Sequence, residues 1–209
     1  MIERNSSDET EVRQQGVTDG LVAQAQQDQK DGFSELYSRL APALFAWIVL
    51  KLRGNHRGRI DPEDLVQEAW WQALRSFKDF DAKRGSFRQW VFGIATHVLL
   101  NALRNLRSRH LAHGSHSWPS GNDVPDEATA VSRRVANDDT LQELIEAVRT
   151  LTPEESSLFM HCGLEGLTAT RAAEIMRLSP DAVAKRWQRL RQKLRGLVHD
   201  AGLIAQQSR

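Results

Sequence analysis

The sequence has few of the residues that build disulfides, metal sites and membrane spans. Cys162 is the only cysteine in 209 residues, which excludes an internal disulfide and a cysteine-based zinc site and fits a reducing compartment. His161 beside it has no second pair of ligands at zinc spacing, so we predict no metal site. No apolar run approaches the roughly 18 residues of a bilayer span, and the N-terminus lacks a signal-peptide core. We therefore expect a soluble, cytoplasmic protein without membrane insertion.

Catalytic motifs are also missing. The sequence contains no glycine loop that would hold a phosphate, no pair of histidines at the spacing of a metalloprotease helix and no nucleophile motif. His110, His113 and His116 fall in a segment that we expect to be a linker, where any metal affinity would be weak and adventitious. We predict no catalytic residue, no cofactor and no enzymatic activity.

Acidic residues are scarce in two stretches of a chain whose formal net charge is only +1. Residues 82–122 contain no Asp or Glu, and residues 179–195 contain only Asp181. Two separated cationic stretches indicate two contacts with one extended anionic partner, most commonly nucleic acid, although two solvated helix faces remain the alternative. The cations are Lys83, Arg84, Arg88, Arg104, Arg107 and Arg109 in the first stretch, and Lys185, Arg186, Arg189, Arg191, Lys193 and Arg195 in the second.

Sustained period-two alternation is absent as well, so we predict an all-α fold. Apolar residues recur at spacings of three and four on either side of a segment, from Ser108 to about Asn137, that is rich in Ser, His, Gly, Pro and Asp. Such a composition is typical of a flexible linker. Pro42 is expected to bend or break the first helix. The predicted order is a disordered tail (1–17), a small helical domain (18–109), the linker (110–138), a second small helical domain (139–199) and a tail (200–209).

The second domain has the pattern of a helix-turn-helix. Thr168 and Ser179 are predicted to cap two short helices, the first with small residues and the second with a cationic outer side. Residues from Ser179 to Arg186 would meet base edges, and the arginines after them would reach phosphates. Arg177 stands at the turn, where glycine adopts a left-handed conformation more easily. An ordinary helical hairpin with a solvated basic face is the alternative.

The first domain contains an acidic helix start. Asp61 is predicted to be the N-cap, Pro62 the first helical residue, and Glu63 and Asp64 the acids that the helix dipole favours in the first turn. Any well-capped helix could use these residues. An acidic surface beside a DNA-binding one nevertheless needs a partner other than nucleic acid.

The next helix is predicted to begin at a capping box formed by Ser86 and Gln89. Trp90 has two interpretations. It is a core residue on the apolar side of this helix, which we favour, or a platform on which an unstacked base would lie.

Three stretches together resemble the extracytoplasmic-function sigma factors of bacterial RNA polymerase: residues 61–68, 86–95 and 165–191. Residues 21–109 are similar to region two of that family and residues 141–197 to region four. The resemblance implies a protein that binds core RNA polymerase, recognises a two-part promoter and melts the DNA near the transcription start. An anti-sigma factor is a further expected partner.

The resemblance also implies roles for individual residues. The acidic helix would dock on the clamp helices of the largest polymerase subunit through Asp61, Glu63, Asp64, Leu65, Gln67 and Glu68. The minus-ten promoter element would be read and opened by Lys83, Arg84, Ser86, Phe87, Arg88, Gln89, Trp90, His97, Asn101 and Arg104. The minus-thirty-five element would be read by Arg171, Ser179, Pro180, Asp181, Ala182, Lys185, Arg186, Arg189 and Arg191.

Some of these positions depart from the pattern of the family. Many relatives carry more Arg and Lys at positions such as His97 and Asn101, and the recognition helix begins with Pro180, Asp181 and Ala182 rather than with small hydroxylated residues. The promoter sequence therefore does not carry over from any relative. A helix-turn-helix regulator that binds duplex DNA without polymerase is the alternative function, but it leaves the acidic helix start without a role.

Overall fold

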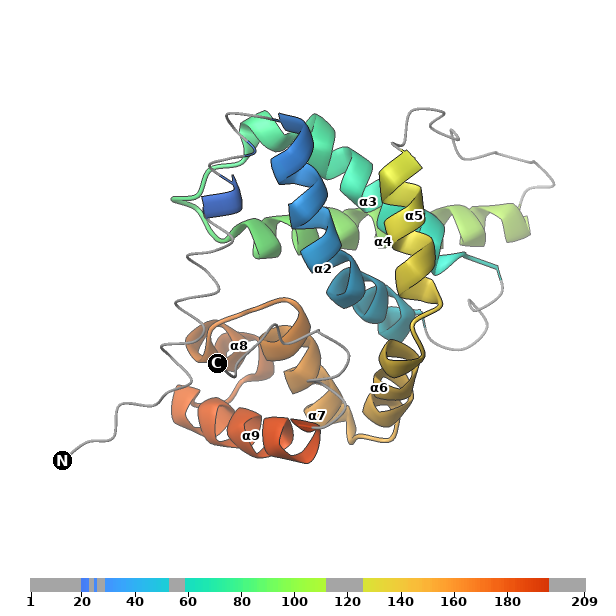
Figure 1. Ribbon diagram of the computed structural model, residues 1–209. Coiled ribbons are helices and arrows are strands. Elements are labelled where there is room, and N and C mark those ends of the chain that lie inside the picture. The colour runs from blue at the N-terminus through green and yellow to red at the C-terminus, as the bar shows by residue number, and fades with distance from the viewer. Residues whose placement is uncertain (1–19, 23–24, 26–28, 53–58, 112–125, 196–209) are drawn as a thin grey trace.

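The computed structural model describes residues 20–22, 25, 29–52, 59–111 and 126–195 (Figure 1). Every regular element in these ranges is a helix, which confirms the all-α prediction. The predicted tails 1–17 and 200–209, and His113 and His116 of the predicted linker, lie outside the described residues. The elements are α2 (Gln29–Lys51), α3 (Pro62–Arg75), the 3-10 helix η2 (Phe77–Asp79), α4 (Phe87–Leu111), α5 (Asp126–Ala136), α6 (Asp139–Arg149), α7 (Pro153–Leu158), the π-helix η3 (Phe159–Leu164), α8 (Ala169–Met176) and α9 (Pro180–Lys193).

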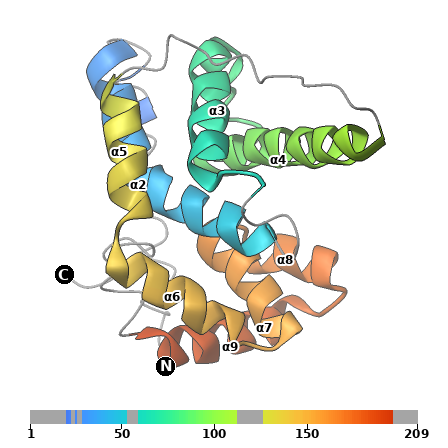
Figure 2. The same cartoon turned by 90° about the vertical axis from the view of Figure 1, so that its right-hand side faces the viewer.

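The helices gather in two units. Helices α2 to α5 form an N-terminal bundle, and α6 to α9 form a C-terminal unit, as both views show (Figures 1 and 2). The two units touch, because α2 packs against α6 and η3 as well as against α3, α4 and α5. Among the described residues, no helix is long and apolar enough to cross a bilayer, and no group of His, Cys, Asp and Glu side chains is placed to hold a metal ion.

A cluster of aromatic rings forms the core of the N-terminal bundle, with Phe87 at its centre. The side chain of Phe87 is 0% exposed. Trp90 is half-buried and packs against Phe80 and Phe87, at ring-centroid distances of 5.4 and 5.5 Å, which supports its interpretation as a core residue. Phe87 was expected on the DNA-binding surface, but its ring has no exposed area in this structure. The rings around Phe87 are Phe33, Trp70, Phe77, Phe80 and Trp90.

Helix α2 continues through Pro42, so of the predicted bend or break the break does not occur. A proline inside a helix costs about 3 kcal/mol. Leu40, Leu44 and Ile48 on both sides of it are buried, and each fully buried aliphatic side chain contributes roughly 1.5–3 kcal/mol. Packing therefore outweighs the unfavourable local propensity.

The prediction of a linker over residues 110–138 is wrong for residues 126–136, which form α5. This helix packs on α2 and α3. Val135 is buried, and the buried hydroxyl of Ser132 is hydrogen-bonded to the hydroxyl of Tyr37 on α2. Burial raises the pKa of Tyr37 to about 12. This helix was missed because its buried side is narrow and includes a serine. The amino-acid composition of the segment therefore resembles that of a linker.

The caps predicted at Asp61, Thr168 and Ser179 are confirmed. The side chain of Asp61 accepts a hydrogen bond from the backbone of the first turn of α3. Thr152 and Glu155 form a reciprocal capping box at the start of α7. Thr168 and Ser179 cap α8 and α9, each through its hydroxyl oxygen at 3.3 Å from a backbone nitrogen. Caps are predictable because they join residues only two or three positions apart.

The turn between α8 and α9 contains the one described non-glycine residue with a positive φ. Arg177 has φ 56° and ψ 45°, a left-handed conformation that costs a residue with a Cβ roughly 1–2 kcal/mol. We expect Arg177→Gly to raise the free energy of unfolding by about 0.5–1 kcal/mol, after the larger entropy of glycine in the unfolded chain is subtracted. Urea unfolding of the full chain would measure this change.

The matched control is Arg189→Gly, at an exposed position in the interior of α9 (Pro180–Lys193). Glycine there lowers stability, by up to about 1 kcal/mol, because it weakens a helix. Loss of stability in both variants would contradict the assignment of strain to the turn.

Candidate nucleic-acid interface

The exposed side of α9 is cationic. Val183 and Leu190 are buried against the rest of the C-terminal unit, whereas Lys185, Arg186 and Arg189 are exposed. The guanidinium of Arg186 lies 3.0 Å from the carboxylate of Glu154 on α7, an exposed pair that water screens. Ser179, Pro180 and Asp181 are exposed at the start of the helix, and Ala182 is half-buried. The surface that α9 offers to a groove therefore consists of its N-terminal turn followed by three cations.

Arg191 does not share this surface. It lies four residues after Trp187, so both are on the same side of α9, and its guanidinium lies 5.8 Å from the centre of the indole ring. Its side chain is half-buried. Arg171 is exposed on α8, where it pairs with Glu174. Arg171 is therefore exposed to solvent, whereas Arg191 is half-buried.

The N-terminal bundle has a second exposed polar surface along α4. His97, Asn101 and Arg104 recur at spacings of four and three and are all exposed. The Arg104 guanidinium donates to the Asn101 side-chain oxygen at 3.0 Å. Leu100 lies on the same surface and is 43% exposed. Sequence reasoning missed Leu100, although its position between His97 and Asn101 would have identified it.

Lys83 and Arg84 are exposed in the turn that precedes α4. Their backbone nitrogens donate to the side chain and the backbone carbonyl of Asp81, at 2.9 and 3.0 Å. The turn is thereby closed by its own aspartate, while both cationic side chains extend into solvent. Ser86 accepts a hydrogen bond from the backbone of Gln89 at 3.2 Å, which is one half of the predicted capping box.

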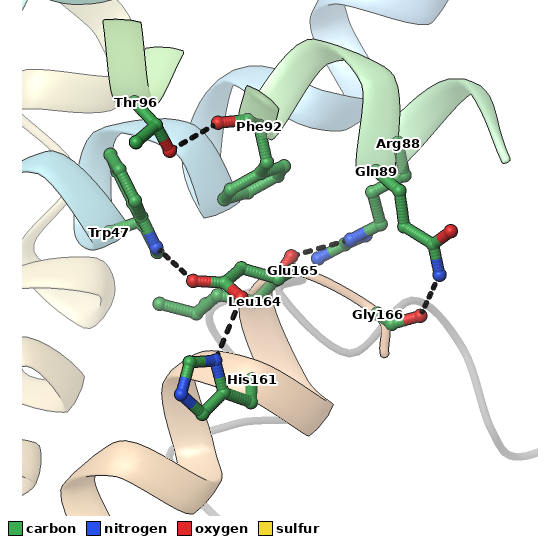
Figure 3. A network of polar contacts seen from close by, with 9 residues as sticks. All are labelled: Trp47, Arg88, Gln89, Phe92, Thr96, His161, Leu164, Glu165 and Gly166. Carbon is green, nitrogen blue, oxygen red and sulfur yellow. Dashed lines mark hydrogen bonds and ion pairs between the residues drawn. The ribbon is translucent and has the colours of Figure 1, made fainter. Parts of the chain in front are cut away.

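Arg88 and Gln89 point into the C-terminal unit rather than toward solvent (Figure 3). The Arg88 guanidinium donates to the carbonyl oxygens of Leu164 at 2.6 Å and Gly163 at 3.2 Å. The Gln89 amide donates to the carbonyl oxygen of Gly166 at 3.0 Å, instead of completing the capping box. Burial lowers the pKa of Arg88 to about 10. Two residues that were predicted to contact DNA thus donate hydrogen bonds to backbone carbonyls of the same chain.

Further hydrogen bonds join the same two units. The Trp47 indole on α2 donates to one carboxylate oxygen of Glu165 at 2.7 Å, and the other oxygen lies 2.8 Å from Nδ1 of His161 (Figure 3). Burial opposes ionisation of Glu165, but the hydrogen bonds from His161 and Trp47 outweigh it and lower the pKa. We call all these contacts the interdomain network, formed by Trp47, Arg88 and Gln89 of the N-terminal bundle with Gly163, Leu164, Glu165 and Gly166 of the C-terminal unit.

The start of α3 carries an acidic surface. Burial and the nearby charge of Asp61 raise the pKa values of Glu63 and Asp64, because ionised carboxylates held together in a partly desolvated place repel one another. Leu65, which was expected to contact polymerase, is 3% exposed and lies in the core. We define the acidic face as the remaining residues, which are exposed or half-exposed: Asp61, Glu63, Asp64, Gln67 and Glu68.

The comparisons with known proteins match both units. Residues 36–109 match the model of Sigma-70 region 2, and residues 141–194 match that of Sigma-70 region 4. Over 166 residues the chain is 25% identical to the ECF RNA polymerase sigma factor BldN of Streptomyces coelicolor. The chain belongs to the extracytoplasmic-function (ECF) sigma factors.

The match to this ECF sigma factor spans most of one relative and about three fifths of another. The match covers 78% of this chain and 59% of BldN. The RNA polymerase sigma factor CnrH of Cupriavidus metallidurans is 26% identical over 185 residues, which cover 85% of this chain and 92% of CnrH. A structure of CnrH in complex with the cytosolic domain of CnrY aligns with a TM-score of 0.40 at 24% identity, over 86% of this chain and 95% of that one.

Helix α5 of this ECF sigma factor lies between the two matched regions, since the first ends at residue 109 and the second begins at residue 141. It is nevertheless packed beside the acidic face. The charge of its Arg133 acts to lower the pKa of Glu63, against the effect of burial. The surroundings of the acidic face therefore include a segment that neither family model describes.

Proposed function

We propose that this sigma factor binds core RNA polymerase through the acidic face and directs promoter-specific initiation. The observation that carries the proposal is a separation of charge. One helix presents carboxylates to solvent, whereas α4 with its preceding turn and α9 present cations and amides. Nucleic acid repels the first surface and attracts the other two. The clamp helices of the largest polymerase subunit are the proposed partner of the acidic face, and a basic surface there would relieve the repulsion between Glu63 and Asp64.

The minus-ten element is proposed to lie along α4 and its preceding turn. Lys83, Arg84 and Arg104 would neutralise phosphates, while His97 and Asn101 would contact opened bases. Leu100 would add an apolar contact to the same surface. Ser86, Arg88 and Gln89 would join them once the interdomain network has opened, and Trp90 would remain in the core.

The minus-thirty-five element is proposed to receive α9 in its major groove. Ser179, Pro180, Asp181 and Ala182 would lie nearest the base edges, because the N-terminal part of a recognition helix enters the groove first. Lys185 and Arg186 would continue the contact, and Arg189 and Arg171 would reach phosphates. Affinity for DNA would then fall steeply with salt, and each base contact would contribute roughly 1–3 kcal/mol of specificity.

Run-off transcription from a random promoter library with core polymerase tests the proposal. The chain should enrich sequences with two separated conserved blocks, and only when polymerase is present. We expect Lys185→Ala with Arg189→Ala to lower initiation at the selected promoter by at least about tenfold, because one base contact is worth about that factor or more. Arg39→Ala removes an exposed cation from α2, where it pairs with Glu35, and should leave initiation unchanged.

A helix-turn-helix regulator predicts a different result. Such a protein would bind duplex DNA tightly by itself and give no transcript with core polymerase. It would also leave the acidic face without a role, and the match to Sigma-70 region 2 does not favour it.

We further propose an anti-sigma protein as a regulatory partner. A protein that covers the acidic face would compete with polymerase, and one that covers α9 would compete with promoter DNA. A protein of the first kind would abolish run-off transcription, and added core polymerase would restore it. A protein of the second kind would abolish run-off transcription, and added promoter DNA would restore it.

A further inference from the structure

A groove lies in the C-terminal unit where α7, α8 and α9 meet (Figures 1 and 2). Its volume is about 370 Å³, within the range of roughly 300–1,000 Å³ that small-molecule sites occupy in proteins. Every described residue that lines it belongs to the C-terminal unit: the start of α7, Met176 at the end of α8, and one side of α9 from Arg186 to Lys193. We call this site the α7–α9 groove.

The floor of the groove is apolar. Leu158 of α7 and Leu190 of α9 line its deepest part, since they are only 2% and 3% exposed, and the half-buried Met176 lines it from α8. A methionine thioether adapts to ligands of different shape. The methylene chains of arginine and lysine side chains also cover apolar groups while their charges stay in water. The floor therefore suits an alkyl chain better than a polar group.

Two ion pairs join α7 to α9 beside the groove. Arg186 donates to the Glu154 carboxylate at 3.0 Å, and Lys193 donates to the Glu155 carboxylate at 3.1 Å. Hydrogen bonds from the Thr152 backbone and from Lys193 lower the pKa of Glu155, so this carboxylate is ionised at neutral pH. The two cations are seven residues apart on α9, which separates them by about 10 Å along the helix. The space between the pairs is short, so it fits a small molecule better than an extended polymer.

Arg189 lies between the two pairs on α9 and lines the same groove. Its side chain is exposed, and no carboxylate among the described residues pairs with it. The groove therefore has three cations and two carboxylates, and the positive charge in excess is that of Arg189. A guanidinium binds a carboxylate through two parallel hydrogen bonds, which are stronger than those between neutral groups. One groove thus combines an anion-binding cation with an apolar floor.

We propose that the α7–α9 groove is a binding site for a small amphipathic anion, a carboxylate with an alkyl chain of medium length. The carboxylate pairs with Arg189, and the chain lies on Leu158, Met176 and Leu190. Arg186 and Arg189 are also proposed to contact the minus-thirty-five element, so the bound anion competes with DNA for α9. This competition rests on the proposed function, whereas binding of the anion itself does not.

The test titrates octanoate into the full chain labelled with ¹³C at its methionine methyl groups. The sequence contains only Met1, Met160 and Met176, so the spectrum is simple, and Met176→Leu identifies the Met176 signal. We expect millimolar octanoate to shift this signal, because few contacts are available to so small a ligand. The Met160 signal should not move, since that side chain is buried and does not line the groove.

Arg189→Ala should weaken octanoate binding by about tenfold, because it removes the charged partner of the carboxylate. Alanine favours a helix, so α9 should remain folded. Lys185→Ala is the matched control: it removes an exposed cation of α9 that does not line the groove, and octanoate should bind as before. Octanol has the same chain without the charge, so its binding should not depend on Arg189.

Three results would overturn the proposal. They are an unmoved Met176 signal, octanoate binding that Arg189→Ala leaves unchanged, and an equal loss of octanol and octanoate binding in that variant. The last result would mean that the groove takes up apolar chains without recognising the anion.

Competition with DNA is measured separately, by fluorescence anisotropy of a labelled duplex of mixed sequence. Octanoate at about ten times its dissociation constant should lower the affinity for the duplex by about tenfold, as expected of a ligand that excludes DNA from one site. Acetate at the same concentration is the control, because it changes the ionic strength equally and lacks the chain. Octanoate that shifts the Met176 signal and leaves duplex binding unchanged would support the groove and refute the proposed contact of Arg189 with DNA.

Discussion

Binding to core polymerase is expected to fall by roughly 10²- to 10³-fold when Asp64 and Glu68 are both replaced by lysine. Like charges brought together across an interface cost several kcal/mol, and the two reversals would place cations where the acidic face offers carboxylates. Asp64 is exposed and Glu68 half-exposed, with Glu68 accepting a hydrogen bond from Gln72 at 2.6 Å. The cost to the fold is about 1 kcal/mol or less, mainly from a cation in the first turn of α3.

Fluorescence anisotropy of the labelled chain with core polymerase would measure this loss. The control is Glu143→Lys with Glu146→Lys, which makes the same change of net charge on the exposed side of α6. Duplex promoter DNA should bind both variants alike, because neither pair touches α9. Normal initiation by the Asp64→Lys, Glu68→Lys variant would refute the docking of the acidic face on polymerase.

The second large effect concerns Phe87. Truncation to alanine is expected to lower the free energy of unfolding by about 3–5 kcal/mol, since the ring is 0% exposed and borders the whole aromatic cluster. The cluster joins α2, α3, η2 and α4, so a cavity there loosens several helices at once. Chemical denaturation would measure the loss.

Phe87→Leu is the matched variant, and it should lose less because most of the volume remains. A chain with Phe87→Ala that keeps its stability but no longer opens the minus-ten element would show that this ring acts on DNA. That result would support a DNA-binding role for Phe87, which the burial of its ring argues against.

Local patterns in the sequence predicted local structure well. Asp61, Thr168 and Ser179 were identified as helix caps, and each caps its helix. The turn residue Arg177 was recognised as a departure, and it is the residue with the left-handed conformation. These features depend on neighbours within a few positions, so one sequence is sufficient to find them.

Burial of individual site residues was less predictable. Leu65 and Phe87 lie in helices whose motifs resemble those of sigma factors, and both side chains turned out to be part of the core. A motif identifies which segment contacts a partner, but the angular position of each residue on its helix decides which side chains are exposed. Arg191 illustrates the same point, because its spacing from Trp187 and not its charge decides where it lies.

The sequence by itself determined the all-α fold, the two units, the caps and the separation of acidic from cationic helices, because these follow from periodicity and composition along the chain. Only the tertiary structure decided that α2 runs through Pro42, that residues 126–136 form a helix on α2 and α3, and that Arg88 and Gln89 bind carbonyls of the other unit. Each of these depends on partners distant in the sequence, and Arg88 meets Leu164 across 76 positions. Hydrogen bonds and packing between such distant residues leave no periodic signal in a single chain.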